Sequence, residues 1–444
     1  DPLLYKLNKS NVPFSQNKYT IALPETAKFS GKTRLKLHRT GIITGMMLNV
    51  RVKILNKAGD DDVVPSTGGL LNLFSKIALT QNNLEINTIT KEYYLWWLSQ
   101  QQYTKKLTNA IAARMNTDGD STNKYENFVN QINIVDGGAN SYDDLSEVTA
   151  VAANAVWSSA MIWLPFPMLN NSSSYIDASF LNQLYLEITW GDVGDVFSNK
   201  GKGSSIDYSN SSLEVYYLNL PPASYQLYQK KQYAQNGKNL NWVIEDIWTE
   251  ETVTSSALAT GATTSEIVNV DLTCNRLIKQ ILIRVSSDQT NGIGGVELYG
   301  DIKLYLNGSV FSSWKPNELQ VIRCNNLSAT DAGPYIPEMN KSGMTQAATY
   351  GVTESGNSNK SERQVLQDDF YVIDFTHPAF QRYLPDSSFS GGVSLDATSD
   401  PHLEINVFAA SATSTTYTVH VSEIFYSIVS INQWDGQVAV SDAR

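Results

Sequence analysis

The chain has four histidines, the side chains that most often transfer protons or bind zinc near neutral pH. They are His38, His377, His402 and His420, and no two of them have the spacing of a known zinc or metalloprotease motif. His38 ends a basic strand pattern, His420 lies within an apolar one, and the other two stand beside prolines. Each histidine is therefore interpreted as structural, and no catalytic residue is predicted.

Acidic side chains are the second candidates for chemistry, as Ca²⁺ ligands or as the carboxylate pair of a glycoside hydrolase. Residues 60–62 are three consecutive aspartates, and Asp192 and Asp195 lie in a later loop pattern. Neither group has the spaced oxygen ligands of a calcium-binding loop, so both are interpreted as solvated turn acids and no metal is predicted. A glycoside hydrolase with an accessory sandwich stays open as a hypothesis, because two acids can converge from distant strands.

The remaining motifs are also structural. The sequence contains no nucleophile elbow, P-loop or dinucleotide-binding glycine pattern, and the glycine-rich residues 292–295 fit a hairpin turn. Its two cysteines, Cys274 and Cys324, lie in apparent strands and are predicted to be buried free thiols. The chain is therefore predicted to be non-enzymatic, with no cofactor.

Length and composition favour two globular domains. A chain of 444 residues is too long for one sandwich, and 42% apolar residues are enough for two cores. Charged residues make up only 17%, which suits a protein that packs against copies of itself. No segment approaches the roughly 18 apolar residues of a membrane span, and no signal-peptide pattern opens the chain.

The charges are unevenly distributed along the chain. Residues 1–57 contain eleven Lys or Arg and two acids, whereas the remainder contains 22 basic and 42 acidic residues. Such an asymmetry is typical of a tail or face that contacts an anionic partner. We expect this basic region to face the interior of an assembly, with these candidate residues: Lys6, Lys9, Lys18, Lys32, Arg34 and Lys36.

Two details refine this expectation. Residues 1–18 show little periodicity and are predicted to form an N-terminal arm. Lys32, Arg34 and Lys36 stand at alternate positions and therefore share one face of a strand. The alternative is that these cations pair with acids elsewhere on the chain or on a neighbouring subunit.

Period-two apolar patterns dominate the sequence and predict an all-β fold. Residues 33–38, 48–54 and 184–190 alternate cleanly, and Asn-Gly or Gly-Gly pairs mark the turns between many such segments. One helix is predicted over residues 91–115, where apolar side chains recur at four-residue spacing. Its opening aromatic cluster is expected to pack onto the sandwich, with a ligand-stacking platform as the alternative.

An internal repeat of about 210 to 235 residues divides the chain into two similar halves. The pattern Leu73, Ile77, Leu79, Asn82 recurs as Leu298, Ile302, Leu304, Asn307. Residues 50–52 match 283–285, residues 163–169 match 373–380, and residues 186–188 match 403–405. A Ser-Phe pair follows the proline-containing segment in each half (Ser179-Phe180 and Ser388-Phe389), and each half closes with a long aromatic strand.

Each half has the eight or nine candidate strands of a jelly roll, a sandwich of two Greek keys. The predicted organisation is an N-terminal arm (1–18), jelly roll 1 (19–222), a connector (223–239), jelly roll 2 (240–435) and a C-terminal tail (436–444). Long inter-strand loops, with the helical insertion in one of them, are placed alike in both halves.

Duplicated halves, matched proline-containing segments and loops inserted at equivalent places resemble the double jelly-roll major capsid proteins of icosahedral viruses related to PRD1-like phages and adenoviruses. The resemblance covers roughly residues 15–435. It implies a homotrimer whose six jelly rolls form a pseudo-hexamer, located in the capsid of a virion that assembles in the host cell. The implied partners are the chain itself, neighbouring trimers and other capsid proteins such as a vertex protein. The arm would contact the viral genome or internal membrane lipid.

A tandem β-sandwich that binds carbohydrate, as an adhesin or viral spike protein, is the main alternative. Nine Trp and 23 Tyr provide material for sugar-stacking faces. Most of these aromatic residues lie within strand patterns, however, where core packing accounts for them.

Overall fold

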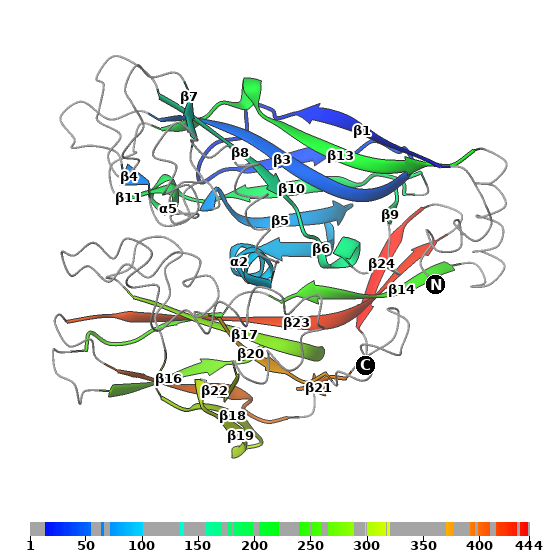
Figure 1. Ribbon diagram of the computed structural model, residues 1–444. Coiled ribbons are helices and arrows are strands. Elements are labelled where there is room, and N and C mark those ends of the chain that lie inside the picture. Colours follow the sequence, from blue (N-terminus) through cyan, green and yellow to red (C-terminus); the bar gives the residue numbers. More distant parts are fainter. Residues whose placement is uncertain are drawn as a thin grey trace.

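Figure 1 shows the computed structural model of the chain. It describes residues 14–54, 64–65, 72–100, 134–136, 156–170, 176–179, 181–198, 204–221, 239–248, 251–258, 265–287, 298, 300–316, 318–319, 370–376, 391–395, 398–408, 414–432 and 436–442. The predicted connector at 223–239, apart from its last residue, lies outside these ranges, as do Lys6, Lys9 and Asp60 to Asp62.

The first half is a two-sheet sandwich. Its elements are β1 (Ser15–Ala22), β2 (Lys32–Lys36), β3 (Ile42–Ile54), β4 (Val64–Pro65), β5 (Phe74–Gln81), β6 (Leu84–Thr90), α2 (Lys91–Gln100), β7 (Ile134–Asp136), β8 (Val156–Trp163), α4 (Pro167–Asn170), β9 (Ile176–Asp177), β10 (Tyr185–Trp190), α5 (Val193–Val196), β11 (Phe197–Ser198), β12 (Ser205–Ile206), η3 (Tyr208–Asn210) and β13 (Ser212–Asn219). One sheet, here sheet 1a, has the order β1-β13-β3-β8-β7, and the other, sheet 1b, has the order β2-β10-β5-β6.

The second half repeats this arrangement. Its strands are β14 (Asn239–Ile247), β15 (Glu251–Thr254), β16 (Ser265–Asp271), β17 (Leu277–Ser287), β18 (Ile302–Leu306), β19 (Ser309–Trp314), β20 (Phe370–Asp374), β21 (Val393–Ser394), β22 (His402–Phe408), β23 (Tyr417–Asn432) and β24 (Val438–Asp442). Sheet 2a has the order β14-β23-β17-β20, with β15, β21 and β24 beside it, and sheet 2b has the order β16-β22-β18-β19.

Both halves have the strand order of a jelly roll. In the first half, β1, β2, β3, β5, β6, β8, β10 and β13 are the eight principal strands in chain order, and in the second they are β14, β16, β17, β18, β19, β20, β22 and β23. Numbered one to eight, they form sheets of order 1-8-3-6 and 2-7-4-5 in each half. The predicted all-β fold of two tandem eight-stranded jelly rolls is confirmed.

The hairpins at the matched Asn82 and Asn307 explain why this part of the sequence repeats. Asn82 and Asn83 have φ of 50° and 66°, and Asn307 and Gly308 have φ of 54° and 71°. Two consecutive left-handed residues form a type I′ turn, whose twist matches that of the flanking strands and which favours Asn and Gly. Each turn joins the fourth and fifth principal strands of its half.

The two sandwiches are stacked, so that four sheets follow one another as layers in the order 1a, 1b, 2a, 2b (Figure 1). Apolar side chains of sheet 2a, among them Ile244, Leu282, Phe370 and Ile424, belong to the same buried cluster as the core of the first half. The core of the second half is a separate cluster between sheets 2a and 2b. Among the described residues, no further sheet packs on the faces of sheets 1a and 2b that point away from the stack.

Helix α2 lies between the two jelly rolls (Figure 1). The hydroxyl of Thr90 accepts a hydrogen bond from the Tyr93 backbone N–H at 3.2 Å and caps its first turn. Tyr93 and Tyr94 are buried, so this aromatic cluster packs in the core as expected. The helix is described only to Gln100, and the rest of the predicted 91–115 segment lies outside the described residues. Among the described helices, none is long and apolar enough to cross a membrane.

A buried ion pair joins α2 to the second half. Arg284 of β17 donates from Nε to Glu92 Oε2 at 2.5 Å and from Nη2 to Oε1 at 2.6 Å. Both side chains are almost completely buried, at 4% and 5% exposure. Burial alone would raise the pKa of Glu92, but the charge and hydrogen bonds of Arg284 outweigh it and lower that pKa to about 2. The carboxylate is therefore ionised at any ordinary pH.

Two predicted boundaries were wrong. Lys18 lies within β1, paired with β13, so the segment before the first strand is shorter than residues 1–18. Residues 438–442 of the predicted tail form β24, which pairs with β23. The side-chain amide of Gln81 accepts from Val438 N at 2.6 Å and donates to Gly436 O at 2.9 Å, which ties this strand to the first half.

We predict that Arg284→Met destabilises the protein strongly, because it leaves the Glu92 carboxylate buried without a counter-charge. A loss of about 3–5 kcal/mol in unfolding free energy is expected, measured by chemical denaturation at pH 7. The double variant Glu92→Met/Arg284→Met should recover most of that loss. The control is Arg34→Met, which removes an exposed ion pair with Glu187 at the edge of sheet 1b. Equal losses for Arg284→Met and Arg34→Met would contradict the prediction.

Candidate functional site

The basic candidates of strand β2 share one exposed face. Lys32, Arg34 and Lys36 are exposed, whereas Thr33 and Leu35 between them are buried. β2 is the edge strand of sheet 1b, farthest from β6. The alternation predicted for this strand is therefore present, and the three cations project from the edge of the first sandwich.

Two of the four described candidates are paired within the chain. Lys18 Nζ lies 3.1 Å from Glu214 Oε2. Arg34 Nε lies 3.2 Å from Glu187 Oε1, and its guanidinium stacks 4.0 Å from the centroid of the Tyr185 ring. These contacts are consistent with the alternative hypothesis, in which the basic side chains form ion pairs with acidic residues of the same chain.

The described histidines lie far apart in the fold and contact different groups. His38 stacks on Tyr19 with 4.3 Å between ring centroids, and His402 stacks on Tyr305 at 4.7 Å. His420 Nε2 lies 3.0 Å from the Ser286 hydroxyl. Within the described residues, no three His, Cys, Asp or Glu side chains gather as a metal site would require. His377 and Cys324 lie outside the described residues.

The other predicted structural residues are also placed. Asp195 Oδ2 accepts from the Asp192 backbone N–H at 3.0 Å, and Asp192 accepts from the Ser30 hydroxyl. These acids close a turn, as the sequence indicated. Cys274 is buried, as the sequence predicted.

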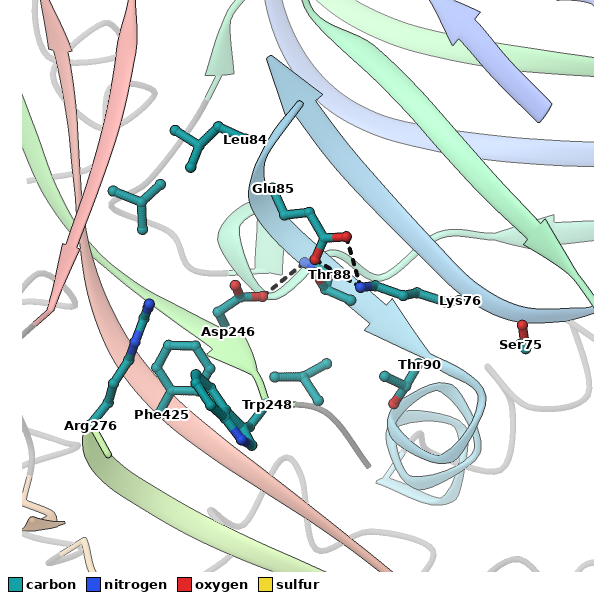
Figure 2. A pocket seen from close by; sticks show the side chains of 12 residues that line it. Ser75, Lys76, Leu84, Glu85, Thr88, Thr90, Asp246, Trp248, Arg276 and Phe425 are labelled. Atoms are coloured by element: carbon teal, nitrogen blue, oxygen red, sulfur yellow. Dashed lines mark hydrogen bonds and ion pairs between the residues drawn. The ribbon is translucent and has the colours of Figure 1, made fainter. Parts of the chain in front are cut away.

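A cleft of about 370 Å³ lies at the junction of the two halves (Figure 2). Lys76 and Glu85 of sheet 1b form an ion pair at 2.7 Å on one wall. Trp248 and Phe425 of the second half contribute aromatic rings to the other. Sequence reasoning missed this cleft, because its walls come from segments that are about 160 to 350 residues apart.

Asp246 is a buried acidic residue that lines this cleft. Its Oδ1 accepts from the Thr88 backbone N–H at 2.8 Å and from the Asn87 side-chain amide at 3.1 Å. Burial raises the pKa of Asp246 to about 7, although the backbone N–H groups of Ile247 and Thr88 and the charge of Arg276 lower it in part. Asn87 also accepts from Met168 N at 3.0 Å, so one amide connects α4, β6 and β14.

The cleft has the features of a structural seam. The Arg276 guanidinium lies 4.8 Å from the centroid of Phe425 and 5.5 Å from that of Trp248, and donates to the Ser427 hydroxyl at 2.9 Å. Each charged side chain on its walls is thus engaged with a group of the same wall or of the opposite half. The arrangement holds the two jelly rolls in a fixed relation.

The outward face of sheet 2b exposes large apolar side chains. Ile267 of β16 is 53% exposed and Phe408 of β22 is 37% exposed, at diagonal positions on neighbouring strands. Val310 and Phe311 of β19 are 48% and 58% exposed at the opposite end of the sheet. These residues are four of the seven large hydrophobic side chains that the described part of the chain leaves exposed. Such clustering is typical of an interface.

The outward face of sheet 1a also has an apolar patch. Trp163 lies directly over Gly45, where an added Cβ would come within 2.3 Å of its ring. Tyr216 tilts against the same indole, with 5.7 Å between ring centroids. Met47 pairs with Trp163 in the sheet, and Met161 follows on the same face. Neither patch was identified from the sequence, although Ile267-Val268 breaks the period-two pattern of β16 and is a signal of this kind.

The fold is similar to that of solved viral proteins. The PBCV-1 protein VP54, from a crystal structure fitted into a cryo-EM reconstruction of the virophage Sputnik, shares 14% identity over 98% of each chain, with a TM-score of 0.60. The mavirus major capsid protein shares 11% identity over 100% of this chain and 95% of its own, with a TM-score of 0.54. The Faustovirus major capsid protein shares 10% identity over 94% and 90%, with a TM-score of 0.53. The chain has the double jelly-roll fold of these proteins.

Neither protein-family models nor curated protein sequences match the chain.

We predict that the paired cations Lys18 and Arg34 contribute little to folding, because exposed ion pairs are largely screened by solvent. Lys18→Gln and Arg34→Gln should each change the unfolding free energy by less than about 1 kcal/mol. Chemical denaturation at low and moderate salt measures this. A loss of several kcal/mol in either variant would show that the basic residues serve the fold instead of an external partner.

Proposed function

We propose that this chain is a non-enzymatic structural protein, the major capsid protein of an icosahedral virus. In this proposal its copies associate as trimers that tile the shell as pseudo-hexamers. The single observation that carries the proposal concerns the two outward faces. Sheet 1a corresponds to sheet 2a and sheet 2b corresponds to sheet 1b, and sheets 1b and 2a are the two that already pack together inside the chain. The major capsid proteins of mavirus and Faustovirus, which have this fold, support the same function.

The junction inside the chain provides a template for association. There, the second sheet of one jelly roll (1b) packs on the first sheet of the next (2a). Because the halves are duplicates, sheet 2b of one copy can meet sheet 1a of another in the same way. Such a contact joins two different faces, so it generates either a closed ring or an open filament. A ring that closes after three chains contains six jelly rolls and has a nearly sixfold outline.

The chemistry of the two outward faces fits this contact. Ile267 and Phe408 on sheet 2b and Trp163 with its methionine neighbours on sheet 1a are apolar groups that gain from burial. The Lys303–Glu404 and Lys18–Glu214 pairs are already neutralised on each face, so burial of these faces leaves few uncompensated charges.

The basic candidates Lys6, Lys9, Lys32, Arg34 and Lys36 are proposed to face the particle interior, whereas Lys18 pairs with Glu214 on the outward face of sheet 1a. An interior surface meets nucleic-acid phosphates or anionic lipid head groups, and both attract Lys and Arg. Lys32 and Lys36 form no ion pair with any described residue, so they are the described cations best suited to such a contact. Lys6 and Lys9 precede them in the chain, and a vertex protein is a further proposed partner.

We predict that the purified protein is a trimer in solution and that one charge on either outward face abolishes it. Phe408→Asp and Trp163→Asp should each give folded monomers, because an unpaired carboxylate would be buried in the contact. Light scattering after size exclusion gives the mass, and circular dichroism verifies the fold. The matched control is Leu84→Asp, since Leu84 is as exposed as Phe408, at 37%, but faces the cleft within the chain.

A trimer that survives both substitutions would reject these faces as the interface. A monomeric wild type that binds glycans would reject the capsid function in favour of a carbohydrate-binding protein.

We predict that Lys32→Glu/Lys36→Glu leaves the trimer intact but impairs the formation of closed, filled particles. The reversed charges would repel the phosphates that the interior surface must contact. Electron microscopy and the nucleic-acid or lipid content of particles from producing cells measure this. Lys315→Glu, an exposed cation of the second half, serves as the control. Normal filled particles from the double variant would reject an interior role for β2.

A further inference from the structure

Glu423 occupies a core position of the second jelly roll. It lies on β23 between Val421 and Phe425, two residues to either side, and both belong to the buried core of this half. Because side chains of a strand alternate between its faces, Glu423 points into the same core. It is 0% exposed.

The duplicated half shows what this position ordinarily contains. Glu423 pairs with Ile281 of β17, and the matching pair in the first half is Leu213 with Leu48 of β3. Leu213 is also completely buried. A carboxyl group thus stands where the other jelly roll has a leucine.

The carboxyl group has little compensation. Among the described residues, neither oxygen of Glu423 has a hydrogen-bond partner of normal geometry. Burying an ionised carboxylate in this state costs several kcal/mol, so such a group takes up a proton instead.

The groups packed around Glu423 favour the neutral acid. Glu251 of β15 is the charged neighbour, and its carboxylate accepts from the Thr273 hydroxyl, which in turn accepts from Trp248 Nε1 at 2.9 Å. The segment between β16 and β17 contributes the backbone of Cys274. Arg276 of that segment directs its guanidinium to Ser427 and the aromatic rings of the cleft.

These contacts determine the direction of titration. Burial raises the pKa of Glu423 to about 8, and the negative charge of Glu251 adds to the increase. The backbone N–H of Cys274 lowers the pKa in part. No cation is among the groups that act on this carboxyl.

We propose that Glu423 is a proton-dependent switch within the second jelly roll: the domain folds around the neutral acid, and loss of the proton loosens the sandwich where β15 meets β23. A group with a raised pKa in the folded state contributes stability that is fully present below its unfolded pKa. That stability is lost as the pH rises through the pKa that the group has in the folded state. The window for Glu423 therefore runs from about 4.5, its ordinary value, to about 8.

The test compares the pH dependence of unfolding in the wild type with that in Glu423→Gln and Glu423→Leu. Relative to either variant, the wild-type unfolding constant should rise by up to about tenfold per pH unit across this window and then level off. Glu423→Gln removes the ionisable group at nearly constant volume, and Glu423→Leu installs the residue of the first half. Asp246 titrates in the same range but is present in every protein compared, so the differences report Glu423 alone.

Two further variants sharpen the result. Glu251→Gln removes the neighbouring charge and should move the upper end of the window to lower pH. Glu318→Gln, at an exposed glutamate, should reproduce the wild-type profile. Infrared difference spectra at pH 7 provide a direct readout, since a protonated-carboxyl band should disappear in Glu423→Gln.

Parallel stability profiles for the wild type and both Glu423 variants, or an unchanged infrared band, would overturn the proposal. These measurements use the purified chain, so their outcome is independent of whether the protein forms a capsid.

Discussion

The structure depends on the junction between two jelly rolls that present unlike faces to each other. A continuous apolar cluster spans sheets 1b and 2a, and the Glu92–Arg284 pair is enclosed within it. Two charges in a low-dielectric seam are tolerated only in a bidentate geometry, so the pair fixes the position of helix α2 against β17. Polar contacts from Gln81 and Asn87 then satisfy backbone groups of the second half along the same seam. The two domains are therefore held as one unit.

This constraint links the fold to the proposed function. Within the described residues, joining the halves through unlike faces leaves one face of each kind without another sheet packed on it. Sheet 2b contributes four of the seven large hydrophobic side chains that the described residues expose, and both outward faces contain internally neutralised ion pairs. The duplication that stabilises the monomer thus also supplies complementary surfaces for association. The proposed trimer extends an existing contact and requires no new kind of interface.

Buried ionisable groups distinguish the two halves, although their strand orders are identical. Arg284 at the junction has a full counter-charge, whereas no cation among the described residues acts on Glu423 in the core of the second half. The first half has Leu213 at the position that corresponds to Glu423. Duplicated domains can therefore share a topology and still differ in how their stability responds to pH.

The sequence by itself determined the strands, the turns and the duplication. Alternation identified the buried and exposed faces of β2 and β10, and the Asn307-Gly308 pair located the hairpin of the second half, because these signals are local. Only the tertiary structure decided which faces meet. Alternation shows that one side of a strand is buried but not against what, and Glu92 and Arg284 are 192 residues apart. For the same reason β24 was mistaken for a tail, since its role depends on Gln81 in the other half. Ile267-Val268 is a local signal of the apolar face of sheet 2b, but the apolar face of sheet 1a and the buried Glu423 follow from packing between distant segments, which no local pattern encodes.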